Sequence, residues 1–259
     1  MHHAPELELP VSKDRYREVD MVGRTPAMAK FARRNTKGVL LRENLFKALG
    51  NVRSSPILWI QSPAGAGKTT LISSYLESQG IPCLWYQVDE SDGDLASFFY
   101  YMRQAVLSVQ PENKEKSQLS LLTPEYTTSM PLFMRRFFEQ LFQEINQERI
   151  VVFDNYQAVS DKPLFHKTMV KGLTAIPPGR QVIIVSREAP PSVFARLKAN
   201  GNMVVLSWEQ LRLSLNESKQ IAELRGYRLS EAQMARVYES CEGWAAGLVL
   251  FLKVEEACG

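Results

Sequence analysis

The stretch Ser62-Pro-Ala-Gly-Ala-Gly-Lys-Thr-Thr70 decides how this sequence is interpreted. It follows an apolar, strand-like run at 57–61 and overlaps the start of a run with helical spacing at 67–79. Glycines let successive backbone N–H groups wrap an anion, while a lysine serves the outer phosphates and a hydroxyl serves magnesium. The order strand, glycine-rich turn, helix therefore predicts a phosphate-binding loop.

The loop provides most of the candidate ligand-binding residues. Lys68 is the candidate for the outer phosphates and Thr69 for the metal, and the positive N-terminal end of the following helix adds to the attraction. Ser62 stands where the common G-x-x-x-x-G-K-[ST] pattern has its first glycine. The predicted nucleotide-binding positions of the loop are Ser62, Ala64, Gly65, Ala66, Gly67, Lys68, Thr69 and Thr70.

Short apolar runs alternate with helix-like segments along the rest of the chain. This alternation predicts a parallel five-stranded sheet covered by helices on both faces, a three-layer α/β fold. A helix from Val39 to Leu49 is expected before the first strand, and the polar, proline-broken segment 110–130 is expected to be a surface connection. The predicted strands are 57–61, 83–88, 150–154, 181–186 and 203–206, and the predicted helices between them are 67–79, 94–109, 131–148, 162–175 and 192–200.

The pattern changes at both ends of the chain. Residues 1–37 mix charges and prolines without a clear period, which indicates an extended or loosely docked arm. Residues 38–208 form the expected nucleotide-binding domain. Residues 209–259 are expected to be a helical subdomain with helices at 216–224, 230–241 and 244–253, the second beginning with a Ser230-Glu-Ala-Gln capping box.

A carboxylate for magnesium is expected on a neighbouring strand. Arg149-Ile-Val-Val-Phe-Asp154 has four apolar residues and then an acid, which parallel topology places at the ligand-binding edge of the sheet. Asp154 is therefore predicted to hold Mg²⁺ together with Thr69. Asn155 follows, where many ATP-hydrolysing proteins carry a second acid, and an amide cannot accept a proton as a carboxylate does. We expect slow ATP hydrolysis at most.

Arg187 follows the strand-like run 181–186 directly. An arginine at the carboxyl edge of a strand can reach the γ-phosphate of a bound nucleotide, and a plain surface arginine is the alternative. Lys68, Asp154 and Arg187 form the candidate catalytic set.

Four segments together resemble the MalT-like, LuxR-type branch of the STAND ATPases, which are signalling relatives of AAA+ proteins. In these proteins a serine at the position of Ser62 is usual. The four segments are Ser62 to Tyr75, Leu84-Trp-Tyr-Gln-Val-Asp-Glu-Ser-Asp92 with Phe98-Phe-Tyr-Tyr101, the pair Val151-Val-Phe-Asp-Asn-Tyr156 and Ile183-Ile-Val-Ser-Arg187, and Glu242-Gly-Trp-Ala-Ala-Gly-Leu-Val-Leu250.

The resemblance also implies an adenine site. Val39-Leu-Leu-Arg-Glu43 is similar to the segment that flanks the base, which makes Arg42 and Glu43 candidates for its wall. Gly243-Trp-Ala245 stands where related switches have Gly-x-Pro, so Gly243 is a candidate while the proline contact to the base is lacking. Met21-Val-Gly-Arg24 is a more literal match to the flanking motif but lies too far upstream.

The function that the resemblance implies is a nucleotide-dependent signalling switch with ATP or ADP and Mg²⁺ as cofactors. ADP would hold the module closed, and ATP with an unknown inducer would let it open and self-associate. Proteins of this type continue into sensor and helix-turn-helix domains. This chain ends at Gly259 after the helical subdomain and carries no helix-turn-helix signature, so DNA binding is expected only through domains that it lacks.

Two other function classes fit parts of the sequence. A small P-loop kinase could use Asp89 or Glu90 as its acceptor-binding acid, although the helical tail 211–253 is not needed for such an enzyme. A protein-binding scaffold with a relic loop is the third possibility, and the intact Lys68, Thr69 and Asp154 argue against it.

Composition sets outer limits on these functions. The formal charge of +3, from 31 basic and 28 acidic residues, is too small to indicate nucleic-acid binding. Cys83, Cys241 and Cys258 lack the spacing of a zinc or redox site. Without a basic leader or an apolar run of about 18 residues, we expect a cytoplasmic protein with no membrane segment.

Overall fold

A computed structural model describes residues 29–110, 119–123, 126 and 129–258. The Met21 to Arg24 match and most of the predicted N-terminal arm lie outside the described residues, as does part of the predicted surface connection at 110–130.

The sheet has five parallel strands in the order β2-β3-β4-β1-β5, which confirms the predicted sheet. Gln61 is in register with Ser186, and Gln87 with Asp154, so the strands end together at one edge. The residues that follow β1, β3 and β4 consequently meet there. The strands are β1 (Ile57–Gln61), β2 (Cys83–Gln87), β3 (Ile150–Asp154), β4 (Val182–Ser186) and β5 (Met203–Leu206).

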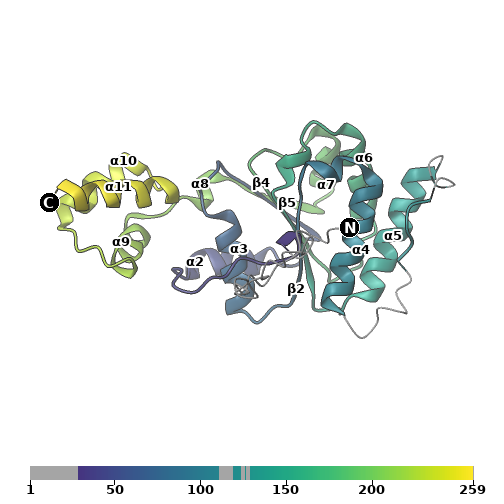
Figure 1. Cartoon of the computed structure of the whole chain (residues 1–259), viewed down its shortest axis with the longest axis horizontal. Helices are drawn as coiled ribbons and strands as arrows, with labels where there is room; N and C mark the ends of the chain where they lie inside the picture. The colour runs from purple at the N-terminus through teal and green to yellow at the C-terminus, as the bar shows by residue number, and fades with distance from the viewer. Residues whose placement is uncertain (1–28, 111–118, 124–125, 127–128, 259) are drawn as a thin grey trace, which may run out of the picture.

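Helices cover both faces of the sheet (Figure 1). Successive strand side chains point to opposite faces, so Leu58 and Ile60 pack with α2 and α3, while Ile57 and Trp59 pack in the core that includes α4 to α6. This arrangement confirms the three layers. The helices are α2 (Glu43–Asn51), α3 (Lys68–Ser78), α4 (Leu95–Val109), α5 (Met130–Glu144), α6 (Pro163–Leu173) and α7 (Ala195–Ala199), and the 3-10 turns are η1 (Glu90–Gly93), η4 (Tyr156–Val159) and η5 (Ser192–Phe194).

Helix α2 begins at Glu43, four residues later than the predicted start at Val39. Arg42 has a non-helical backbone, with φ −90° and ψ 73°. The apolar residues Val39 and Leu40, which suggested an earlier helical turn, instead line a cavity described below. These two side chains are apolar because they line the cavity, and they do not form part of the buried face of α2.

The described part of the N-terminal segment lies against the β2 side of the domain. Lys30 is buried, and its Nζ lies 2.7 Å from Asp89 Oδ2 and 2.9 Å from Asp92 Oδ2. The hydroxyl of Tyr86 donates to Asp92 Oδ1 at 2.6 Å. Burial raises the pKa of the Asp92 carboxyl, and the hydrogen bonds from Tyr86 and Lys30 oppose this shift. These contacts fix the chain just ahead of the nucleotide-binding domain.

The helical subdomain lies at one end of the molecule, beyond α2 and α3 (Figure 1). It has a small core of its own, which includes Leu213, Met234 and Leu248. The link between α10 and α11 needs glycine at position 243, because φ is +76° and a Cβ there would lie 2.6 Å from the carbonyl oxygen of Leu213. The subdomain contains α9 (Leu215–Leu224), α10 (Glu231–Cys241) and α11 (Ala245–Cys258), and α8 (Trp208–Leu211) precedes it and packs on the core that includes α2 and α3.

Candidate nucleotide-binding site

The glycine-rich loop joins β1 to α3 at the carboxyl edge of the sheet. Gly65 and Gly67 have φ values of +73° and +85°, a backbone conformation that glycine adopts without strain. Gly67 is the N-cap of α3, so the helix begins at Lys68 and its N-terminal amides face the cavity beside the loop. This is the local geometry of an anion site.

The cavity beside the loop, which we call the phosphate pocket, has a volume of about 180 Å³. The Nζ of Lys68 donates to the carbonyls of Ser62, at 2.5 Å, and Pro63, at 2.9 Å. The residues that line the pocket are Arg34, Ala64, Gly65, Gly67, Lys68, Thr69, Thr70, Gln87, Asp154, Asn155, Gln157, Val185 and Arg187.

The pKa of Lys68 depends on the charges around it in this pocket. Partial burial and the charge of Arg187 lower the pKa of the Lys68 ammonium to about 8, although Asp154 acts in the opposite direction. An anion placed between Lys68 and Arg187 would relieve their repulsion. The pocket therefore favours a ligand with several negative charges.

Thr69 and Asp154 form the candidate magnesium site. The Thr69 hydroxyl lies 3.1 Å and 3.0 Å from the two carboxylate oxygens of Asp154, which is 4% exposed. Burial raises the pKa of the Asp154 carboxyl, and hydrogen bonds from Thr69 and the Asn155 amide oppose this. A hydroxyl and a carboxylate side by side fit Mg²⁺, which takes few protein oxygens and completes its shell with phosphate and water.

The Asn155 side chain is held by hydrogen bonds and is not placed to act as a general base. Its backbone is left-handed, with φ of 62°, and its side-chain amide donates to the carbonyl of Val88 at 3.0 Å. Gln157 donates to Asn155 Oδ1 and accepts from the Arg187 amide at 3.0 Å. Among the described residues that line the phosphate pocket, Asp154 is the one carboxylate. The pocket thus offers no second acid to activate water.

A second cavity, which we call the base pocket, adjoins the first and has a volume of about 340 Å³. Three parts of the chain form it: the segment before α2, the loop with α3, and the helical subdomain. Most of its lining surface is apolar. The residues are Arg34, Gly38, Val39, Leu40, Arg42, Gly65, Ala66, Gly67, Thr70, Leu71, Ser74, Leu213, Ile221, Leu224, Arg225, Ala245, Ala246 and Val249.

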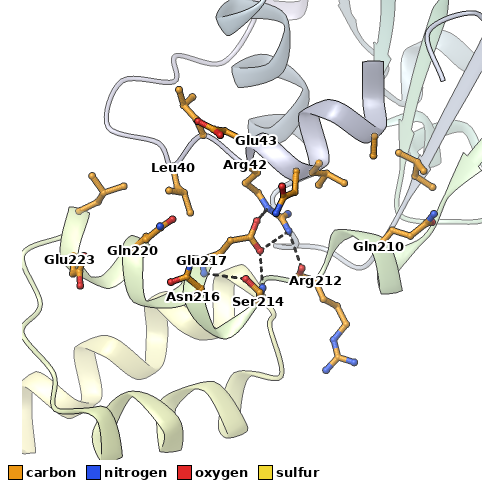
Figure 2. Close-up of a pocket in the computed structure, with 16 residues that line it drawn as sticks. Leu40, Arg42, Glu43, Gln210, Arg212, Ser214, Asn216, Glu217, Gln220 and Glu223 are labelled. Atoms are coloured by element: carbon orange, nitrogen blue, oxygen red, sulfur yellow. Dashed lines mark hydrogen bonds and ion pairs between the residues drawn. The ribbon is translucent and has the colours of Figure 1, made fainter. Parts of the chain in front are cut away.

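Arg42 joins the two parts of the molecule. Its Nε lies 2.7 Å from Glu217 Oε1, and its guanidinium also donates to the carbonyls of Leu211, at 2.7 Å, and Arg212, at 2.9 Å. Figure 2 shows Arg42 reaching from the edge of the core to Glu217 on α9. The guanidinium N–H groups of Arg42 are therefore mostly engaged in contacts with Glu217 and with the carbonyls of Leu211 and Arg212.

The close-up in Figure 2 is centred on a third, larger groove of about 1110 Å³ beside the Arg42–Glu217 ion pair. Glu43 lines this groove and does not line the base pocket. Gly243 lines neither cavity, and its carbonyl instead accepts from the Leu213 amide at 3.0 Å. The structure thus places Arg42 at the base pocket and leaves Glu43 and Gly243 beside it.

The helical subdomain also contacts the loop directly. The Trp244 indole donates to the Ala64 carbonyl at 2.8 Å, and the Ala246 amide donates to the Gly65 carbonyl at 3.0 Å. A Cβ on Gly65 would lie 2.6 Å from the Cβ of Ala246. Gly65 therefore permits both the loop conformation and the close approach of α11.

Of the predicted loop residues, Ala64, Lys68 and Thr69 line the phosphate pocket and Ala66 lines the base pocket. Gly65, Gly67 and Thr70 line both, and Asp154 and Arg187 join the phosphate pocket. Ser62 is 1% exposed and lies beneath the loop, where its carbonyl accepts from Lys68.

Sequence reasoning missed three contributors. Arg34 lines both pockets, Glu217 pairs with Arg42, and Trp244 donates to the loop. The local patterns of their segments give no sign of these contacts, although Trp244 belongs to a segment quoted for its family likeness. Only three-dimensional proximity could have identified the first two.

Asp89 pairs with Lys30, and neither Asp89 nor Glu90 lines the phosphate pocket, so the acids required by the kinase hypothesis are not at the site. Within the described residues, no group of three or more His, Cys, Asp or Glu could hold a metal ion, and no helix is long and apolar enough to cross a membrane.

The fold and loop define a P-loop ATPase-type domain. The chain belongs to the family described as Nephrocystin 3, N-terminal, whose profile matches residues 35–187, more than half of the chain. A Walker-type ATPase of Pyrococcus abyssi has the same fold, with a TM-score of 0.55 and 14% identity over 88% of this chain and 71% of that one.

Curated relatives refine this classification. The chain is 28% identical to the HTH-type transcriptional regulator MalT of Yersinia enterocolitica and 26% identical to that of Serratia proteamaculans, in each case over 83% of this chain. It spans 23% of the length of those relatives. These matches confirm the resemblance to MalT-like proteins drawn from the four segments.

Proposed function

We propose that this chain is the nucleotide switch of a MalT-like regulator and that it binds ADP or ATP across its two adjoining pockets. The observation that carries the proposal is the continuity of an apolar cavity and a cationic cavity through shared loop residues. An adenine nucleotide has the matching shape, with an apolar planar base at one end and phosphates at the other. Ordinary ligand sites combine an apolar cavity with a few placed polar groups in this way.

The roles of the phosphate-pocket residues follow from their positions. The amides of the loop and of the first turn of α3 hold the phosphates, and Lys68 neutralises the outer ones. Thr69 and Asp154 hold Mg²⁺, which when bound neutralises phosphate charge. Arg187 faces the same pocket and would contact the γ-phosphate, which distinguishes ATP from ADP.

Binding is expected to dominate over turnover. Asp154 is occupied with Thr69, and the amides of Asn155 and Gln157 are occupied with each other and with backbone groups. A general base that could take a proton from water is thus lacking in the described lining of the pocket. We expect at most slow hydrolysis of ATP.

The helical subdomain would serve as the responsive part. It contributes one wall of the base pocket and touches the loop through Trp244 and Ala246, so its position depends on what the loop holds. In the proposed cycle, ADP stabilises this closed arrangement, while ATP and an inducer of unknown identity permit opening and self-association. MalT is named a transcriptional regulator, and we propose that control of transcription comes through domains outside this chain.

The test is to denature the purified protein and identify the released nucleotide, then to titrate the emptied protein with ADP, ATP and adenosine by calorimetry. We expect bound ADP and a much higher affinity for nucleotides than for adenosine. An empty site with only weak affinity for either nucleotide would contradict the proposal. Steady turnover of many ATP per second would contradict the switch and indicate an enzyme.

A further inference from the structure

Four described residues line both the base pocket and the phosphate pocket: Gly65, Gly67, Thr70 and Arg34. Three of them belong to the loop, and the fourth comes from the segment before the domain. A ligand that spans both pockets must pass these four residues. In an adenine nucleotide, the part that lies at this junction is the first phosphate, where the ribose meets the phosphate chain.

We propose that Arg34 is a phosphate-binding residue at the junction of the two pockets and that it recognises the phosphate nearest the ribose. This inference rests on the nucleotide-binding function proposed above. It assigns to the N-terminal segment a part in ligand binding, and it separates Arg34 from Arg187, which lines the phosphate pocket alone.

The Arg34 guanidinium is available for a ligand. Its side chain is exposed, and within the described residues no carboxylate or carbonyl pairs with it. Arg42, in the same segment, has its guanidinium engaged by Glu217 and two carbonyls. The charge of Arg34 nevertheless acts on Asp154, where it favours the ionised carboxylate. An arginine within electrostatic range of the metal-site acid and without a partner fits an anion that is bound between them.

The backbone around Arg34 is fixed on both sides. Before it, Lys30 is held by Asp89 and Asp92. Beside it, Arg33 lies 3.7 Å from Glu77 on α3, and the Thr36 hydroxyl donates to the same carboxylate. The segment is thereby attached to the helix that carries the loop. Such attachment lowers the entropic cost of bringing the guanidinium to a phosphate.

The experiment compares Arg34→Gln with the matched control Lys37→Gln and with Arg187→Gln, using ADP, ATP and adenosine as calorimetric probes. Arg34→Gln should weaken ADP and ATP by the same factor, about tenfold or more, and leave adenosine unchanged. Arg187→Gln should weaken ATP more than ADP. Lys37→Gln should bind all three within about twofold of the unmodified protein, because Lys37 is exposed in the same segment and lines neither pocket.

A second readout follows the segment itself. In the unmodified protein, ADP should slow hydrogen exchange of the amides at 33–38, and in Arg34→Gln this protection should be lost. Unchanged ADP affinity in Arg34→Gln would overturn the inference while leaving nucleotide binding intact. An equal loss of adenosine affinity would also overturn it, since the effect would then be structural. If the unmodified protein bound no nucleotide, the proposed function would fail and this inference with it.

Discussion

The phosphate pocket and the base pocket share a wall but are built in different ways. Apart from Arg34, the phosphate pocket is formed by the loop after β1 and by the carboxyl ends of β2, β3 and β4 with the residues that follow β3 and β4, and the sheet fixes the register of these strands. The base pocket takes one wall from the segment before α2 and another from the helical subdomain. The first is therefore a property of the sheet, and the second exists only while the subdomain is docked.

This difference suggests how one ligand could be sensed by two parts of the protein. In the proposed switch, polar groups of the phosphate pocket would supply the binding free energy through charge, whether or not the subdomain moves. The base pocket would convert binding into contact between the subdomain and the core, because a base held there would touch both. Substitutions that affect one pocket and not the other test this division.

The largest effect is expected for Lys68→Ala. Loss of the ammonium removes charge-assisted contacts to the outer phosphates, at a cost of about 3 kcal/mol, or ~100-fold in the affinity for ADP and ATP. Adenosine, which would use only the base pocket, should bind as before. Calorimetric titration measures both, and Lys47→Ala, an exposed lysine on α2, is the control. Unchanged nucleotide affinity would support the relic-loop scaffold instead.

The pH dependence of binding is expected to be the next largest effect. The free protein keeps Lys68 charged below its pKa of about 8, and phosphates would raise that pKa. Affinity for ADP should therefore be flat near neutral pH. Above about pH 8, binding must take up a proton, so affinity should fall by up to about tenfold per pH unit until the pKa of the complex is reached.

Calorimetry in two buffers of different ionisation enthalpy would detect this proton uptake. Adenosine binding should show no such dependence, because its pocket does not include Lys68. A nucleotide affinity that stayed constant from about pH 7 to about pH 10 would mean that another group carries the phosphate interaction.

The two pockets also differ in how far the sequence predicts them. The strands that end in Asp154 and at Ser186 are runs of apolar, mostly β-branched residues, and the loop motif has a fixed spacing, so local pattern was sufficient. At the base pocket, Arg42 pairs with Glu217, and the two residues are 175 positions apart in the sequence. Ion pairs at that separation leave no periodic signal, and Glu217 reads only as part of a helix N-terminus.

An intermediate effect, confined to the base pocket, is expected for Arg42→Ala. The substitution leaves Glu217 without its cation and two carbonyls without a donor, so the subdomain should dock less firmly. Adenosine affinity should fall by about tenfold, whereas pyrophosphate, a ligand for the phosphate pocket alone, should be unaffected.

A double-mutant cycle with Glu217→Gln isolates the pair, since Glu217 also accepts from the Ser214 amide. We expect a coupling free energy of about 1–3 kcal/mol in thermal or urea unfolding. Equal losses of adenosine and pyrophosphate affinity in Arg42→Ala would show that the two pockets do not act separately.

The smallest effect is expected for Trp244→Phe, which keeps an aromatic ring but removes the indole donor to the Ala64 carbonyl. A hydrogen bond of this kind contributes about 0.5–1.5 kcal/mol, so ADP affinity should fall by roughly threefold to tenfold. Trp208→Phe is the matched control, because it makes the same replacement at a tryptophan that lines neither pocket, and it should change ADP affinity by less than about twofold. Since Trp244 contacts the loop rather than lining the base pocket, its substitution should weaken ADP more than adenosine, the reverse of the order expected for Arg42→Ala. These opposite orders would show that the subdomain responds to the phosphates through the Trp244 contact with the loop, and to the base through its residues that line the base pocket.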